Sequence, residues 1–189
     1  MKKVSIFMAA LVMSAATYAQ TWTVDKAHAK LGFTVTHLMV NDVDGMFKNF
    51  DATITASQPD FSDAVFSMTA QTNSVFTDND QRDAHLRSAD FFDADKNPTV
   101  SFVSTSITKE GKDKFAVTGN LTMHGITKKV VLEGSFRSPA VHPMTQKQVA
   151  GFNISGKIKR ADFKLGDTFP DSMVSDEVTI NAKGEFQKG

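Results

Sequence analysis

The sequence predicts an all-β protein, an antiparallel barrel of eight strands with one short helix near residues 80–88. Apolar and polar side chains alternate along most of the chain after residue 20, which is typical of strands with one buried face. Short turn segments separate successive runs, and sequential hairpins favour closure into a barrel over a two-sheet sandwich. The chain of 189 residues is long enough for one domain with a sizeable core.

The first 19 residues (1–19) carry the pattern of a cleaved secretory signal. A positive start with two lysines precedes an apolar run over residues 4–16, and Thr17 and Ala19 are small residues at the positions that a signal peptidase reads. The run is shorter than the roughly 20 residues that a membrane span requires. We therefore expect export, cleavage after Ala19, and a mature domain of residues 20–189.

Eight runs of the remaining chain show strand alternation. Within each run the apolar side chains share one face, which would point into the barrel, while the polar side chains point to water. The predicted strands cover residues 31–35, 50–56, 66–70, 100–107, 115–123, 130–136, 152–158 and 178–186.

The connections follow from turn residues and from one break in the alternation. Tight turns are expected at residues 110–113 and at Gly125, because both segments carry glycine between two strand patterns. Asp78, Asn79 and Asp80 offer helix-capping side chains, and the non-alternating run after them predicts the helix. Longer loops that contain proline are expected at residues 57–63, 138–148 and 162–177.

Composition excludes several classes of function. The chain has no cysteine, so it has no disulfide, thiol nucleophile, thiolate metal ligand or lipidated cysteine. Loss of Lys2 and Lys3 lowers the basic count from 21 to 19 against 21 acidic residues, which leaves no clustered positive charge for nucleic acid. Lys157, Lys159 and Arg160 form the densest basic run, interpreted as one solvated strand face. No second apolar run suggests a membrane segment, so the mature protein is expected to be soluble.

Phenylalanine dominates the aromatic residues, with 16 Phe against one Trp and one Tyr. An eight-stranded barrel is wide enough for either a packed core or one ligand. Phenylalanine has no polar group, unlike tyrosine and tryptophan, and therefore suits a dry lumen. A phenylalanine-rich core fits this composition equally well.

Several segments together resemble the YceI-like family, in matching order from about Trp22 to Phe186. One departure is Lys164, where many members carry glycine after the phenylalanine. The segments are Asp-Lys-Ala-His (25–28), Arg-Asp-Ala-His-Leu-Arg-Ser (82–88), Leu-Thr-Met-His-Gly-Ile-Thr-Lys (121–128) and Arg-Ala-Asp-Phe (160–163).

The resemblance implies a lipocalin-like barrel, exported to the periplasm, that binds a polyisoprenoid or another long-chain lipid in its lumen. Stress response and the transport or storage of isoprenoid quinones are the roles usually suggested for such proteins. We therefore expect a binding protein and not an enzyme, with a long-chain apolar small molecule as partner. We expect no cofactor, no metal and no nucleic acid, and a homodimer is compatible with the sequence.

The inward strand phase predicts which residues contact the ligand. Burial is worth about 0.8 kcal/mol per methylene, so an apolar chain needs no catalytic group to bind. Phe91 and Phe92, which follow the predicted helix, would wall the mouth of the barrel. The predicted lumen residues are Phe33, Val35, Ile54, Phe66, Met68, Phe102, Leu121, Met123, Phe152 and Ile154.

Three residues are candidates for contact with a polar head group. His37 shares the strand phase of the lumen residues, and either a head-group contact or a bond to a neighbouring backbone group would satisfy it. Arg82 and His85 would face the mouth from a helix that acts as a lid, and the planar guanidinium suits phosphate or carboxylate. Asp83 and Arg87 are four residues apart and are expected to pair on the helix surface.

Two alternatives remain beside the carrier hypothesis. The first is an enzyme acting on a lipid or small hydrophobe, with His37 or His85 as general base. The second is a stress-related interaction protein whose core is filled. His124 is out of phase with the inward residues and is expected in a structural role at the Gly125 turn. The sequence contains neither His-Glu-x-x-His spacing nor a Gly-x-Ser-x-Gly elbow.

Overall fold

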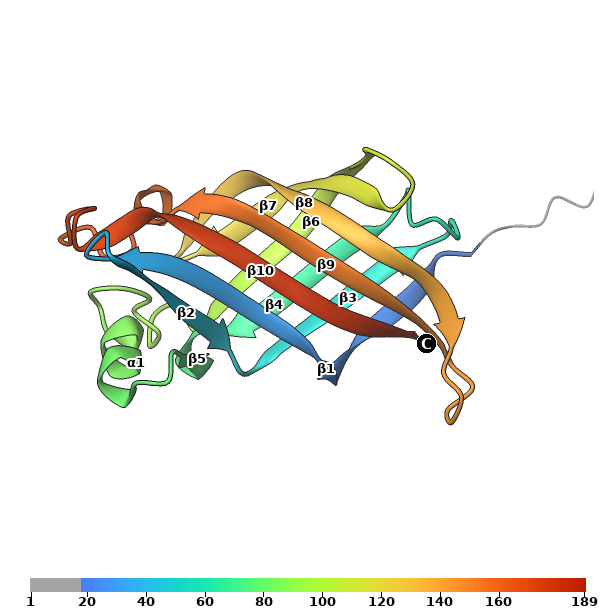
Figure 1. The fold of residues 1–189 in the computed structure, drawn as a ribbon, viewed down its shortest axis with the longest axis horizontal. Coiled ribbons are helices and arrows are strands. Elements are labelled where there is room, and N and C mark those ends of the chain that lie inside the picture. The colour runs from blue at the N-terminus through green and yellow to red at the C-terminus, as the bar shows by residue number, and fades with distance from the viewer. Residues whose placement is uncertain (1–17) are drawn as a thin grey trace, which may run out of the picture.

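In the computed structural model, which describes residues 18–189, the strands form one antiparallel sheet that closes on itself where β1 (Gln20–His37) pairs with β10 (Val174–Lys188) (Figure 1). The order around the sheet is β10-β9-β8-β7-β6-β4-β3-β1-β2-β5. The other strands are β2 (Asn41–Phe47), β3 (Phe50–Ala56), β4 (Val65–Gln71), β5 (Val75–Phe76), β6 (Thr99–Lys109), β7 (Lys114–Met123), β8 (Ile126–Val141) and β9 (Gln148–Lys159).

The predicted eight-stranded antiparallel barrel is confirmed. Each of the eight predicted runs lies in a strand. β2 and β3 both pair with β1, β2 along residues 31–37 and β3 along residues 20–23, so together they form one interrupted barrel strand. β5 is a two-residue strand at the end of the sheet. The predicted signal, residues 1–19, falls outside the described residues except for its last two positions.

Inward glycines make room for the large rings that fill the barrel. A Cβ atom at Gly134 would lie 2.1 Å from the Phe115 ring, and one at Gly119 would lie 2.4 Å from the Phe102 ring. Both distances are far shorter than van der Waals contact, so only glycine permits these rings to lie flat against the wall. The placement of glycine beside a phenylalanine of the neighbouring strand is thus a packing requirement at these two positions.

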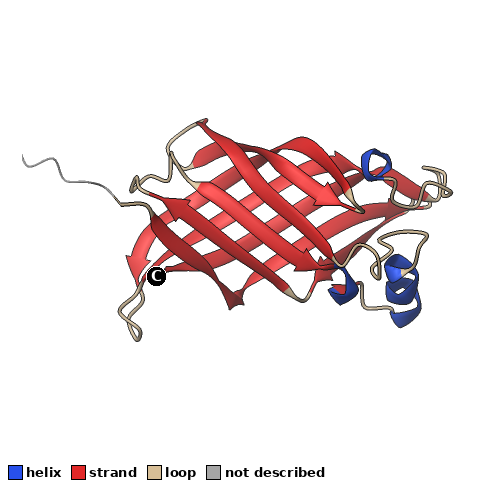
Figure 2. Ribbon diagram, turned by 180° about the vertical axis from the view of Figure 1, so that it is seen from behind, coloured by secondary structure: helices blue, strands red, loops and turns tan. Residues whose placement is uncertain are grey.

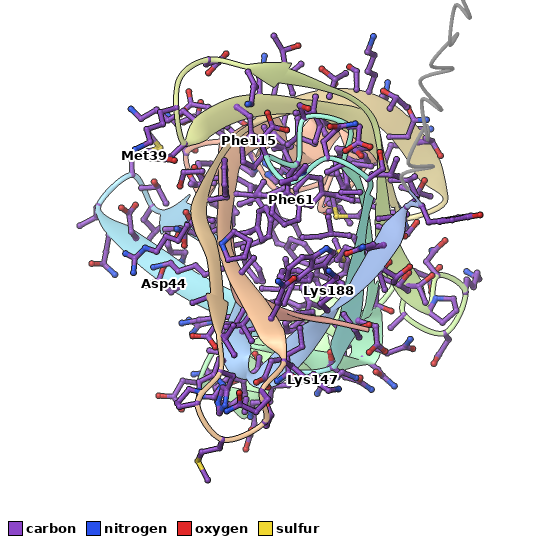
Figure 3. All side chains as sticks on the ribbon, turned by 90° about the vertical axis from the view of Figure 1, so that its right-hand side faces the viewer. Met39, Asp44, Phe61, Phe115, Lys147 and Lys188 are labelled. Atoms are coloured by element: carbon purple, nitrogen blue, oxygen red, sulfur yellow. The ribbon has the colours of Figure 1, made fainter. Side chains whose placement is uncertain are left out.

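Aromatic side chains close one end of the barrel, as the end-on view in Figure 3 shows. Phe61 lies near the middle of this end and is only 4% exposed. Its ring packs edge-on against Trp22 at 5.3 Å and against Phe152 at 4.9 Å between centroids. The proline-containing loop of residues 57–63 therefore folds into the barrel end as a plug.

Hydrogen bonds to two aspartates hold the plug loop in place. The Asp63 carboxylate accepts from the Ser57 amide at 2.8 Å and from its hydroxyl. The Asp60 carboxylate is bonded to Lys109 and Ser62, which lowers its pKa to about 2. These contacts hold Phe61 in a left-handed conformation with φ of 55°.

Helical segments gather at the opposite end of the barrel (Figure 2). The predicted helix is present as α1 (Asp80–Arg87), and Asn79 caps it by accepting from the Arg82 amide at 2.9 Å. Short 3₁₀ turns occur at η1 (Thr72–Ser74) and η2 (Arg160–Phe163). No helix among the described residues has the length and apolar character needed to span a membrane.

The predicted Asp83–Arg87 surface pair is wrong. Asp83 is only 4% exposed, so it does not lie on the solvent-facing surface of α1. Its carboxylate accepts from the Thr77 amide at 2.8 Å and from the Thr77 hydroxyl at 2.6 Å. Because α1 covers the end of the barrel, this side of the helix is buried, and Asp83 satisfies backbone that water cannot reach.

Candidate functional site: an apolar cavity at the open end

A cavity of about 450 Å³ lies inside the barrel beneath α1. This volume falls within the range of small-molecule sites, about 300–1,000 Å³. The barrel wall contributes Phe33 and Val35 from β1 and Ile180 from β10, and Phe91 and Phe92 line the cavity from the segment after α1. The cavity is therefore formed by both the strands and the irregular segments at their ends.

A second cavity of about 100 Å³ lies deeper in the barrel. Both cavities touch Leu31, Met68, Leu121 and Ile180, so they lie next to each other inside the barrel. The deeper cavity is lined by aromatic rings that include Phe152, against which the Phe61 plug packs. The hollow interior thus runs from the α1 end toward the plugged end.

The predicted lumen residues lie around these two cavities, with one exception. Ile54 lines neither cavity and is fully buried (0% exposed) in the core. Contact of any of these residues with a ligand stays a prediction. The first cavity is lined by Phe33, Val35, Met68, Phe91, Phe92, Leu121 and Met123, and the second by Phe66, Met68, Phe102, Leu121, Phe152 and Ile154.

The three head-group candidates all line the larger cavity. Arg82 donates from Nε to the Thr77 hydroxyl and from Nη2 to the Thr77 carbonyl, each at 2.7 Å. His85 Nε2 lies 2.9 Å from Asp90 Oδ2. His37 is the exposed last residue of β1. The structure therefore places all three polar candidates on the wall of one cavity, whose other lining residues are apolar apart from Thr77 and Arg160.

The interpretation of Arg160 as part of a solvated strand face is wrong. Lys157 and Lys159 are exposed, but Arg160 is only 5% exposed and lines the larger cavity. Its guanidinium donates at 2.6–3.3 Å to the side chain of Asp171 and to five backbone carbonyls. Those carbonyls belong to Leu165, Gly166, Phe169, Val174 and Ser175.

Comparison with known proteins identifies a family that covers nearly all of the described residues. Residues 22–186 match the YceI-like domain family. The chain belongs to the YceI-like family. Protein YceI of Salmonella agona is 38% identical over 184 residues, which cover 96% of this chain and 95% of that protein.

Solved structures show the same barrel in other YceI-like and related proteins. BcnA of Burkholderia cenocepacia matches with a TM-score of 0.77 and 26% identity, covering 86% of this chain and 98% of that chain. The YceI protein of Campylobacter jejuni matches with a TM-score of 0.74 and 28% identity, covering 97% and 98%. A polyisoprenoid binding domain from Saccharophagus degradans shares the fold at a TM-score of 0.67 and 14% identity, covering 91% and 100%.

Sequence reasoning missed several residues that line the larger cavity of this YceI-like barrel. Val178 and Ile180 on β10 share the phase of Ala182, so strand alternation could have found them. Leu165, Phe169 and Met173 come from an irregular loop, where no period indicates direction. The remaining lining residues outside the prediction are Leu31, Gly32, Val43, Phe47, Thr77, Leu86, Val100, Ile158, Arg160 and Val174.

Lys164, the departure from the YceI-like pattern, adopts the conformation that glycine favours. It ends η2 with φ of 55° and ψ of 35°. A left-handed conformation destabilises the folded state by about 1–2 kcal/mol for an L-residue. Glycine avoids this strain, but the greater freedom of its unfolded chain lowers the stability by roughly 0.5–1 kcal/mol. The loop therefore keeps its conformation at a small energetic penalty.

We expect Lys164→Gly to raise the free energy of unfolding by up to about 1 kcal/mol. Urea denaturation would measure the change. Lys159→Gly is the matched control, because Lys159 is exposed and extended with φ of −102°, so glycine should destabilise there. A loss of stability in Lys164→Gly as large as in the control would contradict the strain argument.

Proposed function

We propose that this protein is a carrier that holds the chain of a polyisoprenoid or another long-chain lipid inside the barrel. The observation that carries the proposal is the apolar cavity of about 450 Å³ inside a closed barrel, with polar side chains at its mouth. Ten buried methylenes contribute roughly 8 kcal/mol before association costs. Micromolar affinity needs about 8 kcal/mol, so a chain longer than ten methylenes is required to offset those costs.

The polarity of the cavity suggests how such a ligand lies. The apolar chain points toward the Phe152 end, and its polar head stays near Arg82, His85 and His37. Arg82 uses Nε and Nη2 for Thr77, and a guanidinium has five N–H donors in all. The remaining donors suit a head group that accepts hydrogen bonds.

Family membership supports this proposal at the level of the ligand class. The Saccharophagus degradans neighbour is described as a polyisoprenoid binding domain, and at its low identity only the fold carries over. We further propose a periplasmic location from the export pattern of residues 1–19. A role in stress response, or in isoprenoid-quinone transport or storage, is proposed from the resemblance. The two cavities argue against the alternative of a filled core.

The first experiment is a native mass spectrum of the protein purified from its natural host, recorded before and after extraction with organic solvent. We expect an added mass that extraction removes and that fragments as a long-chain lipid or isoprenoid. A bare polypeptide mass under gentle conditions, together with no uptake of added isoprenoid, would contradict the carrier function.

Met68→Glu tests the lumen directly. Met68 lines both cavities, and its neighbour Thr69 on β4 is exposed on the outer face. A carboxylate inside the apolar lumen would be desolvated, so we expect at least a tenfold loss of lipid retention, read as bound lipid per folded protein. Thr69→Glu is the matched control and should retain lipid. Equal retention by the two folded variants would count against a ligand in the barrel.

One observation keeps the enzyme alternative testable. His85 Nε2 is bonded to the Asp90 carboxylate at the cavity mouth, and such a pair can orient an imidazole for proton transfer. An enzyme that uses this base would lose turnover of a bound lipid in His85→Ala, and one that uses His37 would lose it in His37→Ala. Unchanged lipid composition after incubation with wild type and both variants would remove this alternative.

A further inference from the structure

β1 contains a bulge where it pairs with β10, and we call this β1–β10 pairing, which closes the barrel, the seam. Pairing with β10 is regular up to Val24 and Phe186 and resumes at Ala29 and Gly184, so residues 25–28 stand opposite Glu185 alone. Bulges re-aim side chains and are features that a fold keeps for a reason. The bulge bears no side chain that lines the larger cavity, so the proposed carrier function leaves it unexplained.

The bulge brings three potential metal ligands together from the two ends of the chain. His28 Nδ1 lies 3.1 Å from Asp25 Oδ2 and 3.9 Å from Glu185 Oε2. The three ligand atoms all lie within 4.8 Å of one another. An ion about 2.1 Å from each ligand, at angles between octahedral and tetrahedral, would place ligand atoms about 3.0–3.4 Å apart. Small side-chain rotations are therefore enough to enclose an ion.

Hydrogen bonds from neutral groups orient the Asp25 carboxylate toward this point. The Ala27 amide donates to Oδ1 at 3.0 Å, and Gln187 Nε2 donates to Oδ2 at 3.1 Å. Ligating carboxylates in metal sites are commonly held by outer partners of this kind. Asp25 is thus fixed in place without a cation that would neutralise it.

When His28 is neutral, the negative charges of Asp25 and Glu185 have no positive side chain from the described part of the chain beside them. Within residues 18–189, no Lys or Arg nitrogen lies within 4 Å of the Asp25 or Glu185 carboxylate, and the nearby Lys26 pairs with Asp51 instead. The cluster therefore places two carboxylates beside one imidazole with no cationic side chain of that range to balance them, and a divalent ion would supply the missing positive charge.

We propose that Asp25, His28 and Glu185 form a binding site for a divalent transition-metal ion, most readily Zn²⁺, that links β1 to β10 across the seam of the barrel. One imidazole and two carboxylates suit this class of ion, and water completes its coordination. The sequence alone predicts no metal site, because its histidines have no ligand spacing. Only closure of the barrel brings Glu185, near the end of the chain, beside Asp25 and His28.

Titration calorimetry with Zn²⁺ on the full protein without added histidines tests the site. We expect one ion to bind wild type, and we expect His28→Ala and Glu185→Gln each to weaken its affinity at least tenfold. His142→Ala is the matched control, because His142 lies in the loop after β8 and should bind as wild type does. The ion should also raise Tm by roughly 5–10 °C at a hundredfold excess over Kd, because it binds the folded state alone.

Two results would overturn the proposal. One is the absence of binding by wild type at millimolar Zn²⁺. The other is wild-type affinity in both His28→Ala and Glu185→Gln, which would place any bound ion elsewhere, for example at His85 and Asp90. Because Glu185→Gln preserves the shape of an exposed side chain, a folding defect in His28→Ala would not obscure the answer. In the bound state we also expect the ¹⁵N resonance of His28 Nδ1 to shift.

Discussion

Replacing Arg160 by alanine is expected to lower the free energy of unfolding by about 3–5 kcal/mol, because several backbone carbonyls lose a buried charged donor at once. The guanidinium is buried and donates to five backbone carbonyls as well as to Asp171. Each buried carbonyl left without a donor costs roughly 1–3 kcal/mol. The loop between β9 and β10 would open rather than leave all of them unpaired, which keeps the loss below the sum.

Urea denaturation would measure the overall effect of Arg160→Ala, and hydrogen exchange would locate it. The amides of residues 164–175 should exchange faster than those of β7, which lies elsewhere in the barrel. Arg160→Lys should recover less than half of the loss, because an ammonium group lacks the planar fork that reaches several acceptors. Lys159→Ala, at the exposed neighbouring position, should change stability by less than about 0.5 kcal/mol.

A loss below about 1 kcal/mol in Arg160→Ala would mean that water replaces the guanidinium. The loop would then be held by its apolar residues instead. Because Leu165, Phe169 and Met173 line the larger cavity from this loop, Arg160→Ala should also weaken lipid retention. Arg160 acts on the cavity through the loop that it holds.

The strands could be predicted from the sequence because apolar and polar side chains alternate along them. In β7, Phe115, Val117, Leu121 and Met123 alternate with exposed or half-buried residues, and all four are buried. The helix could be predicted because its cap is local, with Asn79 bonded to an amide three residues later. Elements that depend on period or on near neighbours can thus be predicted from the amino-acid sequence alone.

Contacts between distant segments could not be predicted in the same way. The spacing of Asp83 and Arg87 suggested a pair, yet Thr77 presents two donors to Asp83 on the buried side of α1. The charge of Arg160 suggested exposure, yet the loop after η2 wraps around it. In both places a tertiary contact outweighs the local rule, and neither contact leaves a periodic signal in the sequence.

In the candidate site, too, local sequence predicts some features, while others depend on contacts between distant segments. Phe33 and Val35 were placed by strand phase, and both line the larger cavity. Ile54 has the correct phase as well, but it lies toward the plugged end, where side chains leave no space. Phase therefore predicts that a residue points inward, while the position of the hollow along the barrel depends on which loops fold into its ends.

The plug itself provides the other large expected effect, because Phe61→Ala should lower the free energy of unfolding by about 3–5 kcal/mol, as for other large-to-small core changes. The Phe61 ring packs edge-on against Trp22 at 5.3 Å, Phe136 at 5.8 Å and Phe152 at 4.9 Å. Alanine would keep the left-handed backbone conformation, so its strain would persist while the ring contacts are lost. Chemical denaturation would measure the change.

Phe61→Leu is the matched variant, because it keeps most of the buried volume and should lose less than half as much stability. Gln58→Ala, at an exposed side chain of the same loop, should be nearly neutral. Removal of the ring would also loosen the aromatic packing between the deeper cavity and this end of the barrel, so a bound lipid should dissociate faster from Phe61→Ala than from wild type. If Phe61→Ala proves as stable as Gln58→Ala, the loop does not plug the barrel, and both ends would have to be treated as routes to the cavity.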